Sequence, residues 1–225
     1  MDNSKSLLVT ACRILANEGL TDAFGHISVR IPGTDKFLIP PFASPALTNE
    51  SNLLTLDLEG KVLEGKGVPN REVYIHSECY RRRPDLGSVC HTHSPMVKVF
   101  TALGEALRPI ENFASIFAPE TPIYPRVGLI VTTELGREVA ESLGDHRAVL
   151  MRGHGSTVVG LNLKQATVTA IYLEETARLT YRARCLGTPI CFTDEEVTRL
   201  SDYIPKDYAF NRAWDYYASR LPLLK

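Results

Sequence analysis

Hydrophobic positions in the first part of the chain predict one helix followed by two hairpins. From Leu7 to Leu15 apolar residues recur at spacings of three and four, which predicts an amphipathic helix that ends near Gly19. Two pairs of short apolar runs follow, and a polar or glycine-containing turn divides each pair. They predict β-hairpins formed by residues 27–31 with 37–39 and 53–57 with 61–63.

Helices and strands alternate over the remainder of the chain. Helical spacing resumes after Asn70, in the N-cap position, and continues to about Arg83. Residues 109–125 hold four prolines and are predicted to be an irregular loop. The other predicted strands are 86–93, 129–131 and 147–151, and the other predicted helices are one from Pro95, 134–143, 163–186, 193–203 and 207–219. This order predicts a single α/β domain over residues 1–225, with a mostly antiparallel sheet flanked by helices and a helical tail from about residue 187.

Composition and charge narrow the function. With 44% hydrophobic and 23% charged residues, the 225-residue chain is typical of a globular protein. The net charge of −1 gives no basic excess for nucleic acid. No apolar stretch approaches the roughly 20 residues of a membrane span, and no signal-peptide pattern precedes the first helix. The five cysteines form no CxxC pair, so we expect a reduced, soluble, cytoplasmic protein.

The sharpest chemical feature is His91-Thr92-His93, at the end of a predicted strand. Residues i and i+2 of a strand share a face and lie about 6–7 Å apart, so two imidazoles there can converge on one ion. Cys90 points to the opposite face and is predicted to be a buried apolar side chain. His154 stands between Gly153 and Gly155 directly after another strand, where the backbone can turn sharply and bring a third ligand.

Glu72 lies at the start of the helix that follows Asn70. It is interpreted either as a charge that favours the helix N-terminus, as a fourth metal ligand, or as a general base. His76, four residues later, is interpreted as a structural histidine.

These motifs resemble the class II aldolase/adducin family over roughly residues 5–185. The matching segments are 25–30, Glu72 with His76, 83–94, and 152–155 with Gly160. The resemblance implies a three-layer α/β/α fold and one divalent ion per subunit on His91, His93 and His154, with Glu72 as ligand or acid/base. It also implies a homotetramer with sites at subunit interfaces. Such ligands suit Zn²⁺, Mn²⁺, Co²⁺ or Fe²⁺.

The substrate positions differ from those of the sugar-phosphate members. Those members have Gly-Asn at 25–26, Ser/Thr-Gly at 42–43, and small hydroxyl residues at 70–71. Here the phosphate cradle is bulkier, more apolar and cationic, which favours a flat carboxylic acid. Phe42 would stack on a ring, Arg71 would pair with a carboxylate, and His26 would donate to an anionic oxygen. The same predicted substrate site includes Ala43, Asn70 and Ser28.

Residues 25–30 and 151–160 resemble the branch that decarboxylates hydroxylated aromatic or pyridine dicarboxylates. The predicted function is therefore a metal-dependent carbon–carbon lyase, with Glu72 and then His26 as acid/base groups and a metal-stabilised enolate. One alternative is an aldolase for a non-phosphorylated hydroxy-oxo acid or aldehyde. Its usual loop tyrosine is missing here, although Tyr203 or Tyr208 could replace it. The other alternative, a non-catalytic adducin-like module, has no need of three metal ligands.

Overall fold

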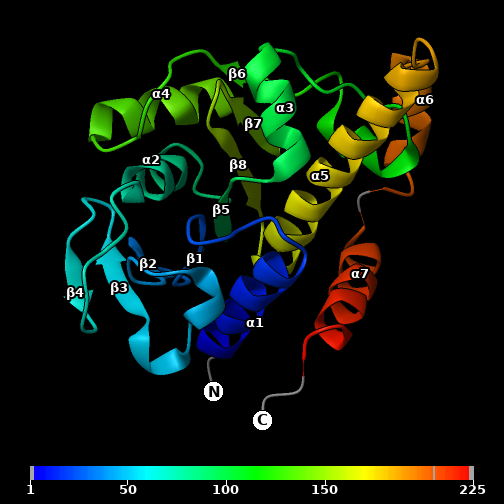
Figure 1. Ribbon diagram of the computed structural model, residues 1–225. Helices are drawn as coiled ribbons and strands as arrows, with labels where there is room; N and C mark the ends of the chain where they lie inside the picture. Colours follow the sequence, from blue (N-terminus) through cyan, green and yellow to red (C-terminus); the bar gives the residue numbers. More distant parts are fainter. Residues whose placement is uncertain (1–2, 205, 223–225) are drawn as a thin grey trace.

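One eight-stranded sheet organises the molecule in a computed structural model, which describes residues 3–204 and 206–222 (Figure 1). The strand order is β4-β3-β2-β1-β5-β8-β7-β6, and every neighbouring pair is antiparallel except β6 with β7. The strands are β1 His26–Arg30, β2 Lys36–Ile39, β3 Leu54–Asp57, β4 Val62–Glu64, β5 Ser88–Thr92, β6 Ile123–Tyr124, β7 Ala148–Met151 and β8 Gly155–Gly160.

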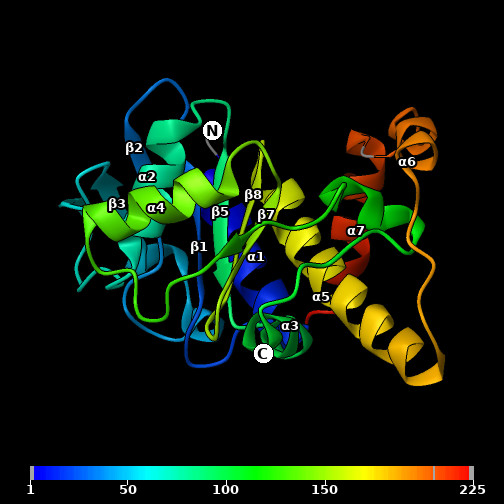
Figure 2. The same cartoon turned by 90° about the horizontal axis from the view of Figure 1, so that it is seen from above.

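Helices cover both faces of this sheet. Figures 1 and 2 show α2 and α4 on one face, and α1, α3 and α5 on the other, with α7 packed against α5. The α-helices are α1 Ser4–Asn17, α2 Val73–Arg82, α3 Pro95–Leu103, α4 Thr133–Leu143, α5 Leu163–Leu186, α6 Asp194–Ser201 and α7 Asp207–Ser219. The predicted three-layer α/β/α fold with a mostly antiparallel sheet is confirmed.

Alternation along the central strands divides the core into two. Val89 and Val159 pack with α2 and α4, whereas Cys90 and Val158 belong to the cluster beneath α1, α3 and α5. Successive strand residues face opposite sides of a sheet, so one strand serves both cores. Cys90 is fully buried on the face away from His91, as predicted.

The region between α3 and α5 differs most from the sequence prediction. The strand predicted at 129–131 is wrong, because this segment is a loop that pairs with no strand. The nearby strand is instead β6, inside the region predicted to be irregular, and a 3-10 helix, Asn112–Phe117, precedes it. Strand β8 was not predicted, since its glycines and hydroxyl residues resemble a turn before the long helix.

The start of α2 also differs from the prediction. The helix begins at Val73 and its N-cap position is Glu72, so the prediction of Asn70 as the N-cap was wrong. The side-chain oxygen of Asn70 accepts a hydrogen bond from the backbone N–H of Glu72 at 3.4 Å. Glu72 makes no side-chain capping bond, which leaves its carboxylate available for other partners.

The C-terminal aromatic residues divide between packing and exposure. Phe210, Trp214 and Tyr217 are buried against the rest of the protein, whereas Tyr203 and Tyr208 are largely exposed. Among the described helices, none combines the length and apolar character needed to cross a bilayer.

Candidate metal centre

Four side chains from three segments meet on the α2 face, at one end of the central strands. His91 is on β5, His93 directly follows that strand, His154 is in the turn between β7 and β8, and Glu72 directly precedes α2. One ligand atom from each lies within 4.8 Å of the others. The structure thus brings together all four residues that the sequence predicted as metal ligands.

Two glycines allow His154 to reach this position. Gly153 has a φ of +65°, a left-handed conformation that side chains with a Cβ rarely adopt. At Gly155 an added Cβ would lie 2.2 Å from the backbone oxygen of Thr92 and 3.0 Å from the His93 ring. The glycines therefore permit both the tight turn and the close approach of β8 to β5.

Backbone groups orient two of the four side chains. The Nδ1–H of His91 donates to the backbone oxygen of Ser156 at 3.0 Å, which leaves Nε2 facing the cluster. One carboxylate oxygen of Glu72 accepts the backbone N–H of Ile130 at 2.9 Å. The other lies 3.7 Å from Nε2 of His91 and 3.6 Å from Nε2 of His154.

The donor set fits a divalent cation. Both ring nitrogens of His154 are buried without a hydrogen-bond partner among the described residues. The Nε2 atoms of His91 and His93 face each other at 3.0 Å, so a proton or a cation must lie between their lone pairs. Three imidazole nitrogens and one carboxylate oxygen suit Zn²⁺, Mn²⁺, Co²⁺ or Fe²⁺.

The electrostatic environment keeps His91 and His93 neutral, as metal ligands must be. Burial, followed by the proximity of His26, holds the pKa of His91 well below its ordinary value. Burial and then His154 lower the pKa of His93 to about 4. Near neutral pH both imidazoles therefore offer lone pairs to a cation.

His26 lies beside the cluster but is almost completely enclosed. It pairs with His91 across β1 and β5, and their ring centroids are 5.2 Å apart. Its Nδ1 lies 2.6 Å from Nε2 of His76 on α2, and the side chain is only 2% exposed.

Ser28 does not have the exposure of a substrate-binding residue. It lies two residues after His26 on the same face of β1, and it is fully buried. Its hydroxyl bonds to Nδ1 of His76 and to the hydroxyl of Tyr80. Contact between Ser28 and substrate stays a prediction, and in this structure α2 covers the side chain and uses its hydrogen bonds.

The other four predicted substrate residues lie on two adjacent segments. The backbone N–H of Phe42 donates to the backbone oxygen of Val68 at 2.8 Å, so the two segments run side by side. Phe42, Ala43 and Arg71 are exposed, and Asn70 is half-buried. Their contact with substrate stays a prediction.

Sequence reasoning missed several contributors to the site. Phe24 is 56% exposed, and its ring centroid lies 6.3 Å from that of His93, which places a free aromatic face beside the cluster. Its position just before the Gly25-His26 motif was an available signal. The backbone N–H of Ile130, which binds Glu72, and the backbone oxygen of Ser156, which binds His91, left no sequence signal. Almost any residue type supplies the same backbone groups.

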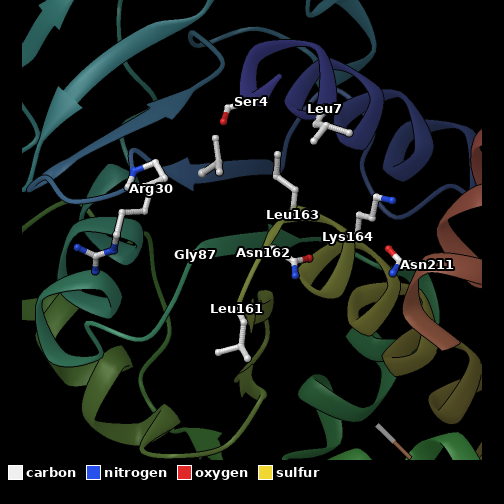
Figure 3. A pocket seen from close by; sticks show the side chains of 11 residues that line it. Ser4, Leu7, Arg30, Gly87, Leu161, Asn162, Leu163, Lys164 and Asn211 are labelled. Carbon is white, nitrogen blue, oxygen red and sulfur yellow. The ribbon is translucent and has the colours of Figure 1, made fainter. Parts of the chain in front are cut away.

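A hollow of about 420 Å³ lies at the other end of the central strands from the metal cluster (Figure 3). Its lining includes Arg30 at the end of β1, Gly87 before β5, and Leu161 after β8. The guanidinium of Arg30 donates to the backbone oxygens of Tyr80 and Leu86, so its hydrogen bonds are used within the protein. This hollow holds none of the predicted site residues.

A family model and curated relatives match most of this chain. Residues 6–181 match the Class II Aldolase and Adducin N-terminal domain family, and the chain belongs to that family. A 3,4-dihydroxyphthalate decarboxylase from Arthrobacter keyseri is 32% identical, with 97% of this chain and 94% of that protein covered. A 5-deoxy-D-ribulose 1-phosphate aldolase from Bacillus thuringiensis serovar kurstaki is 30% identical, over 68% of this chain and 72% of the relative.

The fold comparison gives the same family. The structure of an L-fuculose 1-phosphate aldolase from Glaciozyma antarctica matches with a TM-score of 0.85 and 25% identity, over 96% of this chain and 87% of the other. The predictions of the family, of the fold and of a carbon–carbon lyase are confirmed. Divalent-metal dependence is typical of this family, and the four-residue cluster supplies a matching site.

Proposed function

We propose that this lyase decarboxylates a hydroxylated aromatic or heteroaromatic dicarboxylic acid, using one divalent cation per subunit. The intact cluster of Glu72, His91, His93 and His154 carries this proposal, because such a donor set serves chemistry that builds negative charge on oxygen. The decarboxylase relative supports the reaction. The exposed Phe42 and Arg71 support a flat, anionic substrate better than a sugar phosphate.

The protein groups have separate roles in this reaction. A bound cation supplies Lewis-acid stabilisation of the charge that develops on a substrate oxygen. Arg71 pairs with one substrate carboxylate, and Phe24 or Phe42 lies against the ring. His26 donates a hydrogen bond to an anionic oxygen.

Glu72 is the proposed acid/base group, because one of its oxygens is held by Ile130 and the other faces the cluster. It takes the proton of the ring hydroxyl and delivers a proton to the ring carbon that bears the carboxylate. This protonation gives a keto form. The carbon–carbon bond then breaks, CO₂ leaves, and the electron pair of that bond restores the aromatic ring as a phenolate, which takes a proton from water.

A CO₂-release assay tests the proposal. Metal-stripped protein is reloaded separately with Mn²⁺, Zn²⁺, Co²⁺ or Mg²⁺, and each form is offered ortho-hydroxylated benzene- and pyridine-dicarboxylates. We expect metal-dependent CO₂ release that His93→Ala abolishes and His146→Ala retains, since His146 lies outside the cluster. Absence of CO₂ from every substrate would reject decarboxylation.

The aldolase relative makes an aldol reaction the second candidate. In this reaction the same cation site would act on a hydroxy-oxo acid or aldehyde. Metal-dependent cleavage of such a substrate, without CO₂ release, would replace the decarboxylase proposal with this one.

We also propose a homotetramer whose sites lie at subunit interfaces. Large apolar side chains near the site are exposed in the isolated chain, among them Phe24, Phe42 and Leu129, and burial against a neighbour would remove them from water. Light scattering coupled to size exclusion measures the assembly. A monomer of 25.0 kDa that is fully active would overturn this proposal.

A further inference from the structure

A buried chain of polar side chains runs from the core of α2 to the edge of the metal cluster. The Tyr80 hydroxyl lies 2.8 Å from Oγ of Ser28, and that oxygen lies 2.7 Å from Nδ1 of His76. Nε2 of His76 in turn lies 2.6 Å from Nδ1 of His26. All four side chains are at most 2% exposed, so water does not replace these hydrogen bonds.

The Tyr80 phenol determines which partner donates in each of these hydrogen bonds. Burial raises the pKa of Tyr80, so its hydroxyl keeps its proton. A backbone hydrogen bond from Val89 to the Tyr80 hydroxyl lowers the pKa of Tyr80, which is the effect of an N–H donor. Val89 therefore offers no acceptor for the phenol proton. Tyr80 therefore donates to Ser28, the partner that remains among the described residues.

Each later hydrogen bond follows from the first. Ser28 accepts from Tyr80 and donates its own proton to Nδ1 of His76. Burial lowers the pKa of His76 to about 3, so this ring carries one proton, and that proton is on Nε2. His76 donates it to Nδ1 of His26. The reverse direction would leave the buried phenol proton without an acceptor, and an unsatisfied buried donor is costly.

We infer that Tyr80, Ser28 and His76 are positioning residues that fix His26 as the Nε2–H tautomer, so that His26 presents an N–H donor to an anionic substrate oxygen beside His91. Nδ1 of His26 carries the bond to His76, so Nε2 is the ring nitrogen that remains for a ligand. The His26 ring lies next to that of His91, with 5.2 Å between the ring centroids. The chemical class that it selects is a carboxylate or phenolate oxygen. Only the identity of that substrate rests on the proposed function.

Histidine NMR tests the tautomer without any turnover. The Zn²⁺-loaded protein, labelled with ¹⁵N-histidine, gives long-range ¹H–¹⁵N correlations that distinguish a protonated from an unprotonated ring nitrogen. His26→Gln identifies the His26 signals by their loss. We expect a protonated Nε2 and an unprotonated Nδ1, and a protonated Nδ1 at His26 would overturn the inference.

Two serine variants test whether the chain sets the tautomer. In Ser28→Ala, Nδ1 of His76 has no partner, whether or not it carries the proton of that ring, so neither tautomer is favoured. We therefore expect the His26 signals to move to values between those of the two tautomers. Ser88→Ala is the matched control, because Ser88 is equally buried on the paired strand and donates only to the Ser28 backbone. A Ser28→Ala spectrum identical to that of the wild type would show that the chain has no influence.

Two substitutions at His26 test the donor role. We expect His26→Leu to lower kcat/KM at least about tenfold, as loss of a hydrogen bond to a charged group does, and His26→Gln to recover part of this because its amide can donate. If wild-type protein releases no CO₂, binding of benzene-1,2-dicarboxylate to the Zn²⁺-loaded form replaces the assay. Equal values for wild type, Leu and Gln would reject the donor role.

Discussion

Glu72 connects the metal cluster to the loop that precedes α4. One carboxylate oxygen is held by the backbone N–H of Ile130, and the other faces His91 and His154. A single side chain thus joins the start of α2, the loop before α4 and the ligand set. The loss of its negative charge should affect both metal binding and proton transfer.

We predict that Glu72→Gln weakens metal binding about 10- to 100-fold and lowers CO₂ release by at least as much. The glutamine keeps an acceptor for Ile130 but turns an amide toward the cluster. Competition with a chromogenic chelator measures the affinity. Glu138→Gln is the control, since that carboxylate, on α4, pairs with Arg126 and accepts a hydrogen bond from the Tyr124 hydroxyl on β6. Full turnover and unchanged affinity in Glu72→Gln would remove this residue from the mechanism.

Phe24 should contribute to the binding of an aromatic substrate. Its exposed ring beside His93 offers a face for stacking, which contributes about 0.5–1.5 kcal/mol beyond burial. We predict that Phe24→Ala raises KM about three- to tenfold and changes kcat less. Phe42→Ala, measured in parallel, shows which ring faces the substrate. Leu186→Ala at the exposed end of α5 is the control, and a Phe24→Ala KM equal to the control value would assign Phe24 to another role.

The sequence was informative about single residues where chemistry and spacing coincide. Strand geometry predicted that His91 and His93 share a face, and flanking glycines indicated that His154 could approach them. The role of Ser28 could not be predicted, because it depends on α2 covering that side of β1. His76 was interpreted as a structural histidine, and it is fully buried, but its link to His26 requires the sheet and the helix together.

At the level of elements, periodicity predicted what is long or amphipathic. The helix predicted at 163–186 is α5, and both hairpins are present. The missed β8 is buried on both faces and contains glycine, serine and threonine, so it has no alternation of apolar and polar residues. Residues 129–131 have the apolar run of a strand but serve as a loop whose backbone binds Glu72.

The packing of α2 against α4 depends on Gly136. A Cβ at this position would lie 2.4 Å from the backbone oxygen of Tyr74, so the two helices approach closely. We predict that Gly136→Ala lowers the free energy of unfolding by about 1–3 kcal/mol. Because Tyr74 lies two residues after Glu72, metal affinity should fall as well.

Thermal unfolding and chelator competition measure these two effects, with about 2–4 °C in Tm expected per kcal/mol for a chain of this size. Gly187→Ala is the control, since no atom lies within 4 Å of an added Cβ there. A Tm for Gly136→Ala equal to that of the control would mean that the helices can separate at little cost.

At the scale of the whole molecule, five of the six histidines form one connected group on the α2 face. Burial is the largest cause of a lowered pKa at His26, His76, His91 and His93. The folded protein therefore holds neutral imidazoles that the unfolded chain would protonate in mild acid. Stability without metal should depend on this difference.

His76 shows in which direction stability changes with pH. Burial lowers the pKa of this histidine from 6.5 to about 3. Between these values the unfolded state binds more protons than the folded state, so stability rises with pH and falls as pH drops below about 6.5. At pH 5 the cost from His76 alone is on the order of 2 kcal/mol. Urea unfolding in chelator at pH 7.5, 6 and 5 measures it. His76→Gln cannot take up this proton, so its pH dependence should be shallower by about that amount, whatever its stability at pH 7.5. An equal slope in both proteins would show that acid sensitivity arises elsewhere.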